Sequence, residues 1–244
     1  MRLHFDNIPS TSTYIKEHIA EFNHGDWVSA SFQSGGRGQR GNSWESEDGQ
    51  NALFSIMFTP HAVSPANGFV MNHIVALAVL DVLDYHLPSG LKAMVKWPND
   101  IYVGDKKICG ILIESSMSSN RFETAVAGIG LNVNQERFLS DAPNPVSMFQ
   151  LAGRKYDVDE IMKNAVYAAM NRYERYANGF DFKQEYMYRL YRFNQWHKYI
   201  DSDGVMFEGM IVDVLPGGLL VVKTKENKEN QLRCFEFKSI KYVI

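Results

Sequence analysis

Two arginines stand among four glycines in one short segment of the sequence. Residues 33–44 read QSGGRGQRGNSW, which places the arginines at positions 37 and 40. Because glycine lacks a Cβ, its backbone N–H groups can face a ligand directly, and each guanidinium presents a planar fork to carboxylate or phosphate oxygens. The segment therefore predicts an anion-binding loop. The alternative is a glycine-rich hairpin loop whose arginines lie in water, although four glycines are more than a turn requires.

The residues around this loop distinguish it from better-known glycine motifs. Gly36, Gly38 and Gly41 match the G-x-G-x-x-G pattern of dinucleotide-binding folds, in which the loop opens a helix. Here an alternating segment precedes the loop and the apolar run 51–58 follows it, so both neighbours are predicted as strands. The kinase motifs His-Arg-Asp and Asp-Phe-Gly are absent, as is the P-loop pattern. These three nucleotide-binding classes are therefore excluded.

A lysine at the end of a predicted strand is the second candidate group. In residues 91–97, alternate positions place Lys92, Met94 and Lys96 on one face of a strand and only apolar residues on the other. The sequence Pro98-Asn99-Asp100 then breaks the strand. Such a lysine can be an edge-strand residue that discourages aggregation. The Trp-Pro-Asn-Asp sequence directly after it favours a positioned positive charge instead.

The third candidate segment, residues 127–134, reads AGIGLNVN. Gly128 and Gly130 leave one face of the predicted strand without side chains, so a flat ligand or another backbone can approach it. A β-bulge explains the two glycines equally well.

Composition and charge limit the class of protein. The chain has 244 residues, 45% of them hydrophobic, and a formal net charge of −3. It should be globular, and the charge argues against DNA or RNA as its main partner. The first residues lack a signal-peptide core and no apolar stretch can span a membrane, so we expect a cytoplasmic protein. Cys109 and Cys234 lie in strand-like runs and are predicted to be small buried residues without a disulfide.

The order of predicted elements indicates an α+β protein with two domains. Four helices are predicted to begin near residues 10, 64, 157 and 181, and strands are predicted at 2–5, 92–97, 101–103, 109–115 and 123–134. After about residue 190, short runs separated by turn signals are typical of a small β-barrel. We therefore predict a ligand-binding domain over residues 1–190 and a β-barrel domain over residues 191–244.

Together, these segments resemble those of one family, the biotin protein ligases, also called biotin–[acetyl-CoA-carboxylase] ligases or holocarboxylase synthetases. The resemblance covers essentially the whole chain, and its most specific parts are the arginine loop and the Lys96-Trp-Pro-Asn-Asp100 sequence. It also includes Ser10-Thr-Ser12, the run 109–114 and Gly128-Ile-Gly-Leu-Asn132. It implies a catalytic domain built on a mixed β-sheet, like that of class II aminoacyl-tRNA synthetases, with helices packed on it and a small SH3-like β-barrel after it.

The resemblance also implies an activity. Enzymes of this family use MgATP to convert biotin to biotinyl-5′-AMP, and then transfer the biotinyl group to one lysine of a biotin carboxyl carrier protein of acetyl-CoA carboxylase or a related carboxylase. The first step joins two anions, the biotin carboxylate and the α-phosphate of ATP, so fixed cations are expected to offset their repulsion. By resemblance, Lys96 bridges the carboxylate and the α-phosphate as a protonated group, while Arg37 and Arg40 hold phosphate.

The other implied site residues follow by motif position. Biotin binding is implied for Ser10, Thr11, Ser12, Gln33, Gly36, Arg37, Gly38, Lys96, Gly110, Gly128 and Gly130. ATP binding is implied for Arg37, Gln39, Arg40, Trp44, Lys96 and Asn132, with Trp44 covering the nucleotide and Asn132 meeting adenine. The sequence indicates no magnesium ligand.

This chain differs from the family pattern at two positions. The loop often has arginine where this chain has Gln39, and the first segment commonly has asparagine where this chain has Ser12. Arg40 is expected to take over the first role. Some members carry an N-terminal DNA-binding domain, but here the motifs begin at Ser10, so we expect a monofunctional ligase that does not bind DNA. The resemblance is also compatible with a homodimer.

Two alternative functions stay open at this point. A lipoate or octanoyl protein ligase shares the chemistry, but the Trp-Pro-Asn-Asp sequence and the all-β C-terminus weigh against it. A biotin or nucleotide sensor without turnover is the second alternative. Retention of Lys96, Arg37 and Arg40 weighs against it, because a pure binder needs no charge at a reacting centre.

Overall fold

A seven-stranded mixed sheet forms the larger part of this computed structural model, which describes residues 1–38, 44–139, 144–226 and 229–244. The strand order is β1-β2-β3-β7-β6-β5-β4. Only β1 and β2 pair in parallel; the other neighbours are antiparallel. The strands are β1 (Arg2–Ile8), β2 (Trp27–Gln33), β3 (Ala52–Phe58), β4 (Ala93–Lys96), β5 (Asp100–Val103), β6 (Lys106–Ser118) and β7 (Arg121–Leu131).

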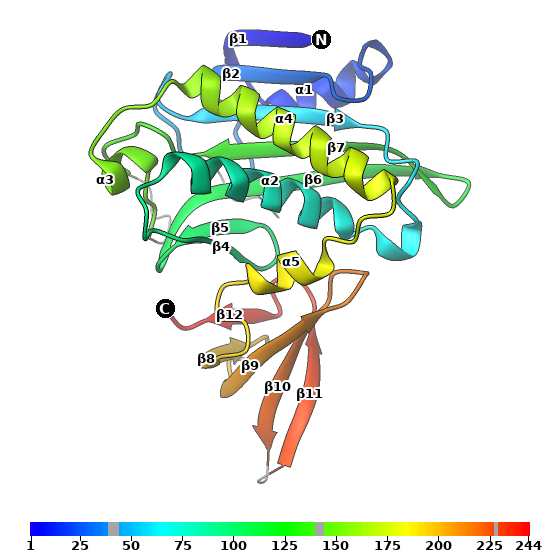
Figure 1. Ribbon diagram of the computed structural model, residues 1–244, viewed down its shortest axis with the longest axis vertical. Coiled ribbons are helices and arrows are strands. Elements are labelled where there is room, and N and C mark those ends of the chain that lie inside the picture. The colour runs from blue at the N-terminus through cyan, green and yellow to red at the C-terminus, as the bar shows by residue number, and fades with distance from the viewer. Residues whose placement is uncertain (39–43, 140–143, 227–228) are drawn as a thin grey trace.

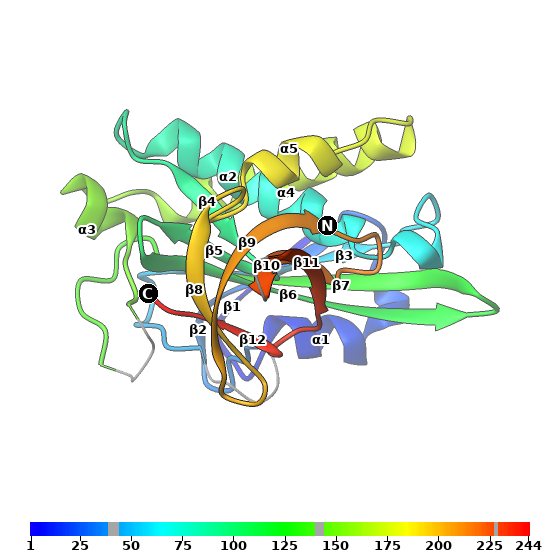
Figure 2. The same cartoon turned by 90° about the horizontal axis from the view of Figure 1, so that it is seen from below.

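Helices cover both faces of this sheet. The helices α2 (Val70–His86) and α4 (Val158–Ala177) pack side by side on one face, and α1 (Thr11–Glu17) packs on the other (Figures 1 and 2). Twelve of the seventeen residues of the apolar helix α2 are buried, as expected for a helix between a sheet and other helices. The main core therefore lies between the sheet and α2 and α4, and a smaller one lies under α1.

A second, smaller sheet follows at the β4 edge of the first (Figure 1). Its order is β11-β10-β9-β8-β12, and all its neighbours are antiparallel. The strands are β8 (Trp196–Asp201), β9 (Met206–Val214), β10 (Leu220–Glu226), β11 (Glu229–Phe235) and β12 (Ile240–Tyr242). Among the described residues no strand pairing joins β11 to β12, so the β-rich C-terminus is confirmed as an open antiparallel sheet, and the expected barrel closure is not observed. The domain boundary at residue 190 stays a prediction.

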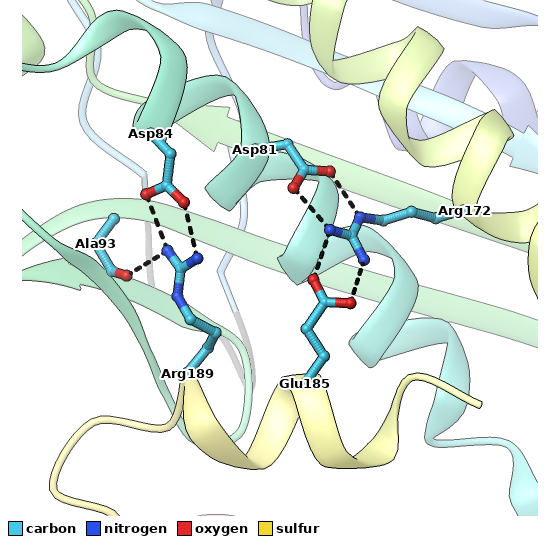
Figure 3. A network of polar contacts seen from close by, with 6 residues as sticks. All are labelled: Asp81, Asp84, Ala93, Arg172, Glu185 and Arg189. Atoms are coloured by element: carbon cyan, nitrogen blue, oxygen red, sulfur yellow. Dashed lines mark hydrogen bonds and ion pairs between the residues drawn. The ribbon is translucent and has the colours of Figure 1, made fainter. Parts of the chain in front are cut away.

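Salt bridges attach the short helix α5 (Lys183–Tyr188), which leads into the small sheet, to the helical layer (Figure 3). Arg172 on α4 donates two hydrogen bonds to Asp81, of 2.6 and 2.7 Å, and two to Glu185 on α5, of 2.7 and 3.2 Å. Just after α5, Arg189 pairs with Asp84 and also donates to the carbonyl of Ala93 at 2.9 Å. The chain then enters the small sheet from a fixed position beside β4.

The elements differ from the sequence predictions at several boundaries. The helix predicted to begin at Ser64 is a 3₁₀ turn over Pro65–Asn67, and α2 begins only at Val70. Just before α2, the N–H of Phe69 donates a hydrogen bond of 3.3 Å to the carbonyl of Pro216, which lies in the turn between β9 and β10. The first helix ends at Glu17 and continues as the 3₁₀ turn Ile19–Glu21.

Three smaller features complete the comparison with the predicted elements. The helix predicted from Asp181 spans Lys183–Tyr188 (α5), and a further short helix, α3, spans Met148–Ala152. Cys109 is buried, as predicted, but Cys234 is exposed because it lies on the face of β11 opposite to the buried Phe235. Among the described residues, no helix is long and apolar enough to cross a membrane.

Candidate active site

A cavity of about 1410 Å³ opens on the α1 face of the large sheet and reaches the end of the small one. On β7, Ala127 and Ile129 face the main core and Val126 faces the core under α1, so Gly128 and Gly130 also face α1. Of the described residues that the sequence assigned to ligands, all but Gly36 line this cavity: Ser10, Thr11, Ser12, Gln33, Arg37, Gly38, Trp44, Lys96, Gly110, Gly128, Gly130 and Asn132.

One wall of the cavity is a network of hydroxyl and amide groups at the start of α1. Ser10 caps that helix by accepting a hydrogen bond from the N–H of Thr13 at 3.3 Å. The backbone N–H and the Oγ1 of Thr11 both donate to Gln33 Oε1, at 2.8 and 3.1 Å. Ser55 of β3 lies 2.7 Å from Thr11 Oγ1 and 2.8 Å from Ser12 Oγ. Three distant segments thus present one polar surface.

The sequence did not single out Ser55. It is the one polar residue in the otherwise apolar strand β3, and it pairs with Gly128 on β7. A fully buried hydroxyl inside an apolar run was the available signal, because such a group needs a partner. Gly128 matters here for a steric reason, since a Cβ at this position would lie 2.5 Å from Ser12 Oγ.

The other two glycines contact a different group from Gly128. Gly110 and Gly130 are direct partners on β6 and β7, and the indole of Trp44 lies against both of them. A Cβ would come within 2.9 Å of the indole at Gly110 and within 2.6 Å at Gly130. The three glycines therefore have two different roles: the Gly110–Gly130 pair supports the Trp44 ring, and Gly128 makes room for Ser12.

Lys96 lies at the end of β4, with its ammonium among aromatic rings. Its Nζ donates to the hydroxyl of Tyr102 at 3.2 Å and lies 4.7 Å from the centre of that ring and 5.0 Å from the ring of Tyr242. Burial lowers the pKa of Lys96 from its ordinary value, and the carboxylate of Asp100 partly opposes this shift. Lys96 is thus a positioned cation with little water around it.

The residues that follow Lys96 each have a separate contact. Trp97 is buried and donates from Nε1 to the carbonyl of Gly218 at 3.0 Å, which joins the two sheets. Asn99 exchanges hydrogen bonds with Ile111 of β6. Asp100 forms a 2.7 Å salt bridge with Lys107.

Lys107 is a second cation of the cavity that the sequence analysis missed. Its Nζ lies 5.5 Å from the centre of the Trp44 ring, and the side chain lines the cavity. It follows the turn at Gly104-Asp105 as one of two adjacent lysines, 106 and 107. The alternation of side chains on β6 distinguishes them, because Lys106 is exposed and Lys107 half-buried.

The arginine loop is only partly described. Arg37 donates from Nη2 to Thr13 Oγ1 at 2.7 Å, which joins the loop to α1. Gln39 and Arg40 lie outside the described residues, so the roles predicted for them remain predictions. Asn132, expected to meet adenine, lines the cavity but donates its Nδ2 to the carbonyl of Val146 at 3.0 Å, and its Oδ1 has no partner among the described groups.

Solved structures of biotin protein ligases share this fold. The ligase of Aquifex aeolicus in complex with biotin and ATP superposes with a TM-score of 0.77 at 20% sequence identity, over 99% of each chain. The ligase of Leishmania major in complex with biotinyl-5-AMP gives a TM-score of 0.60 at 19% identity, over 96% of this chain and 98% of that one. At this identity the likeness establishes the fold.

Curated relatives are similar over the part of the chain that contains the site. The bifunctional ligase/repressor BirA of Salmonella typhimurium is 34% identical over 137 residues, which are 56% of this chain and 42% of that protein. The biotin–[acetyl-CoA-carboxylase] ligase of Paracoccus denitrificans is 31% identical over 146 residues, which are 56% of this chain and 58% of that one. The chain thus spans less than half the length of this BirA relative.

The family follows from the N-terminal half of the chain. The model of the biotin/lipoate A/B protein ligase family matches residues 4–132. This range contains every described site residue that the sequence predicted, from Ser10 to Asn132, as well as Ser55 and Lys107. Because the match covers more than half of the 244 residues, the protein belongs to the biotin/lipoate A/B protein ligase family.

Proposed function

We propose that this protein is a biotin protein ligase, which converts biotin and ATP to biotinyl-5′-AMP and pyrophosphate and then transfers the biotinyl group to a lysine of a biotin carboxyl carrier protein. The observation that carries the proposal is the position of Lys96, a half-buried ammonium on the same cavity as the Thr11–Ser12–Gln33 wall. Curated relatives named as biotin ligases support it.

The polar wall suits the head group of biotin. A ureido group has two N–H donors and one carbonyl acceptor, and hydroxyl groups can both donate and accept. The hydroxyls of Thr11, Ser12 and Ser55 already form one hydrogen-bonded chain. Burying the ureido group without partners would be costly, so this wall gives the neutral end of the substrate a preferred place.

The cations suit the reacting end. The carboxylate of biotin and the α-phosphate of ATP repel each other, and a fixed ammonium in a poorly hydrated site stabilises the charge that develops as they join. Lys96 takes this role. Lys107 and Arg37, which line the same cavity, add positive charge for the phosphates, and the Trp44 indole offers a flat apolar face for the base.

Magnesium has no assigned ligand in this proposal. The described residues contain no group of three or more His, Cys, Asp or Glu side chains that could hold a metal ion, and Asp100 is already paired with Lys107. The described side chains therefore do not form a metal site by themselves. We include Mg²⁺ as the companion of ATP, whose phosphate oxygens are typical Mg²⁺ ligands, and derive no step from it.

The test is a transfer assay with matched substrates. The purified chain is incubated with biotin, MgATP and a biotin carboxyl carrier domain, and the mass of that domain is measured. We expect the gain of one biotinyl group. A parallel reaction with lipoate and a lipoyl carrier domain tests the alternative within the family, and transfer of lipoate but not biotin would overturn the proposal.

A pair of lysine variants tests the assigned role. In Lys96→Ala, biotin-dependent ATP–pyrophosphate exchange should fall by about 10² to 10³, the typical effect of losing one group that stabilises transition-state charge. Lys106→Ala is the matched control, because Lys106 is exposed at the start of β6 in the same sheet and does not line the cavity. Exchange at the unmodified rate in Lys96→Ala would remove this lysine from the mechanism.

We also propose that the protein is located in the cytoplasm.

A further inference from the structure

The last strand of the chain ends beside Lys96. β12 pairs with β8 through Ile240–Asp201, Lys241–Ile200 and Tyr242–Tyr199, so the small sheet presents this strand to the large one. Its residues line the cavity along with the segments of the catalytic domain. The small sheet is therefore part of the cavity wall, a role that the sequence could not assign.

Two aromatic rings flank the ammonium of Lys96. The ring of Tyr102 comes from β5 of the large sheet, with its centre 4.7 Å from Nζ, and the ring of Tyr242 comes from β12 of the small sheet, at 5.0 Å. Among the described residues, Nζ has one hydrogen-bond partner, the Tyr102 hydroxyl at 3.2 Å. A cation that has lost water gains from an aromatic face within about 6 Å, so the rings replace part of its hydration.

The Tyr242 ring is held by its own neighbours. It meets Tyr199 edge-on at 5.2 Å and stacks on Tyr191 at 6.1 Å. Arg192 donates to the carbonyl of Val243 at 2.9 Å, which fixes the end of β12. The hydroxyl of Tyr242 is buried and has no partner among the described residues, so the ring alone accounts for its contact with Lys96.

We propose that Tyr242 is a positioning residue of the reaction, whose ring holds the Lys96 ammonium charged and directed into the cavity. The inference rests on the proposed adenylation. It makes the small sheet a working part of the active site, because the sheet supplies one of the two faces that stabilise the reacting cation. The small sheet docks on the large one through the hydrogen bond from Trp97 to Gly218. This docking places Tyr242 of β12 beside Lys96, the lysine that acts in the first chemical step.

The charges around Lys96 explain why the ring matters. The groups that influence it are Asp100 on β5, Lys107 on β6 and Arg192 before β8, together with the Tyr102 and Tyr242 rings. Burial, Lys107 and Arg192 all lower the pKa of Lys96, and Asp100, which raises it, is itself paired with Lys107. Loss of the Tyr242 ring therefore removes a stabiliser of the charged form from a site with few others.

Three variants separate the ring from its hydroxyl and from general stability. Tyr242→Leu keeps an apolar side chain but removes the aromatic face, Tyr242→Phe keeps the ring, and Phe207→Leu removes an aromatic ring of the same sheet that stacks on Tyr199 and Phe235, away from Lys96. In biotin-dependent pyrophosphate exchange we expect kcat to fall roughly tenfold in Tyr242→Leu, which corresponds to about 1.4 kcal/mol. Tyr242→Phe and Phe207→Leu should stay within about twofold of the unmodified protein.

The pH profile gives a readout that a purely structural role would not change. In Tyr242→Leu the alkaline limb of kcat/KM should move to lower pH, because the pKa of Lys96 falls when the π face is lost while the site stays apolar. The limb should not move in Tyr242→Phe. An unshifted limb in Tyr242→Leu, together with kcat within twofold of the unmodified protein, would overturn the proposal.

A double-mutant cycle isolates the pair and protects the test against loss of folding. Binding of a non-hydrolysable biotinyl-5′-AMP analogue is measured in the Tyr242→Leu, Lys96→Met and double variants, each checked for folding by circular dichroism. We expect Tyr242→Leu to weaken binding roughly tenfold with Lys96 present and less than twofold with Met at position 96. Equal losses in both backgrounds would show that Tyr242 does not act through Lys96. Failure of the unmodified protein to catalyse exchange would count against the proposed function instead.

Discussion

Replacing Arg172 by Met tests how the helical layer is held to the small sheet. The Arg172 side chain is 7% exposed and makes four hydrogen bonds, two to Asp81 on α2 and two to Glu185 on α5 (Figure 3). Methionine has a similar apolar stem but no charge. The variant therefore leaves two carboxylates facing each other without a cation between them.

The expected cost follows from the burial of the three groups. Removing one partner of a fully buried ion pair costs about 3–5 kcal/mol, whereas an exposed pair contributes about 0–1 kcal/mol. Here the cation is buried, but Asp81 and Glu185 are 45% and 39% exposed and can regain water. We therefore expect Arg172→Met to lower the free energy of unfolding by about 2–3 kcal/mol, or Tm by roughly 5–10 °C for a domain of this size.

The assay is urea unfolding followed by circular dichroism, with two matched comparisons. Lys163→Met removes an exposed ion pair with Asp159 on the same helix, at 2.7 Å, and should cost less than about 1 kcal/mol. Adding Asp81→Asn and Glu185→Gln to Arg172→Met removes the repulsion and should restore about 1 kcal/mol. If Arg172→Met unfolds at the same urea concentration as Lys163→Met, the reasoning from burial is wrong.

Two further predictions address the cavity and the core. Gly130→Ala places a methyl group 2.6 Å from the Trp44 indole, so the indole must move. We expect ATP binding, measured by calorimetric titration, to weaken about tenfold or more, and the free energy of unfolding to fall by about 1 kcal/mol, the low end of the usual cost of overpacking. Unchanged ATP binding would show that Gly130 does not contribute to the nucleotide site. His73 is buried against Tyr186, and burial lowers its pKa from 6.5 to about 4. In the unfolded chain His73 is protonated below about pH 6.5, whereas in the folded chain it stays neutral down to about pH 4. The free energy of unfolding therefore falls as the pH falls through this range. Between pH 7 and pH 5, the free energy of unfolding of the unmodified protein should fall by about 2 kcal/mol more than that of His73→Leu, at about 1.36 kcal/mol per pH unit. Equal losses in urea titrations of the two proteins would contradict a buried, neutral His73.

The sequence predicted those parts of the fold and the site that depend on short-range pattern. Sequence pattern identified β4 and β7 as strands and predicted a helix that begins near residue 10, where Ser10 caps α1 in the structure. Motif resemblance then selected residues from segments 10–12, 33–44, 96–100 and 128–132, which the strand order brings to one cavity. These features were accessible because each is encoded within about a dozen residues.

Features that depend on contacts between distant segments were not predictable in the same way. Ser55 appears in the sequence only as a polar exception in an apolar strand, and its importance comes from its contacts with Thr11 and Ser12. Lys107 differs from Lys106 only in the face of β6 that it occupies. Tyr242 lies beside Lys96 because the two sheets dock, and no local pattern near either residue records that docking.

The residues of the Trp-Pro-Asn-Asp sequence have separate structural roles, although the sequence is recognised as one motif. Trp97 lines the cavity, but its indole donates a hydrogen bond to the carbonyl of Gly218 and packs against Phe237 at 5.3 Å, so it also anchors the small sheet. Asp100 pairs with Lys107 and thereby fixes a second cation. Lys96 is thus held between the contact that docks the small sheet and the residues that set the charge of the cavity. Among the described interactions the Trp97 indole makes no contact with Lys96. A substitution at Trp97 should nevertheless slow the reaction, because it would displace Tyr242 from Lys96.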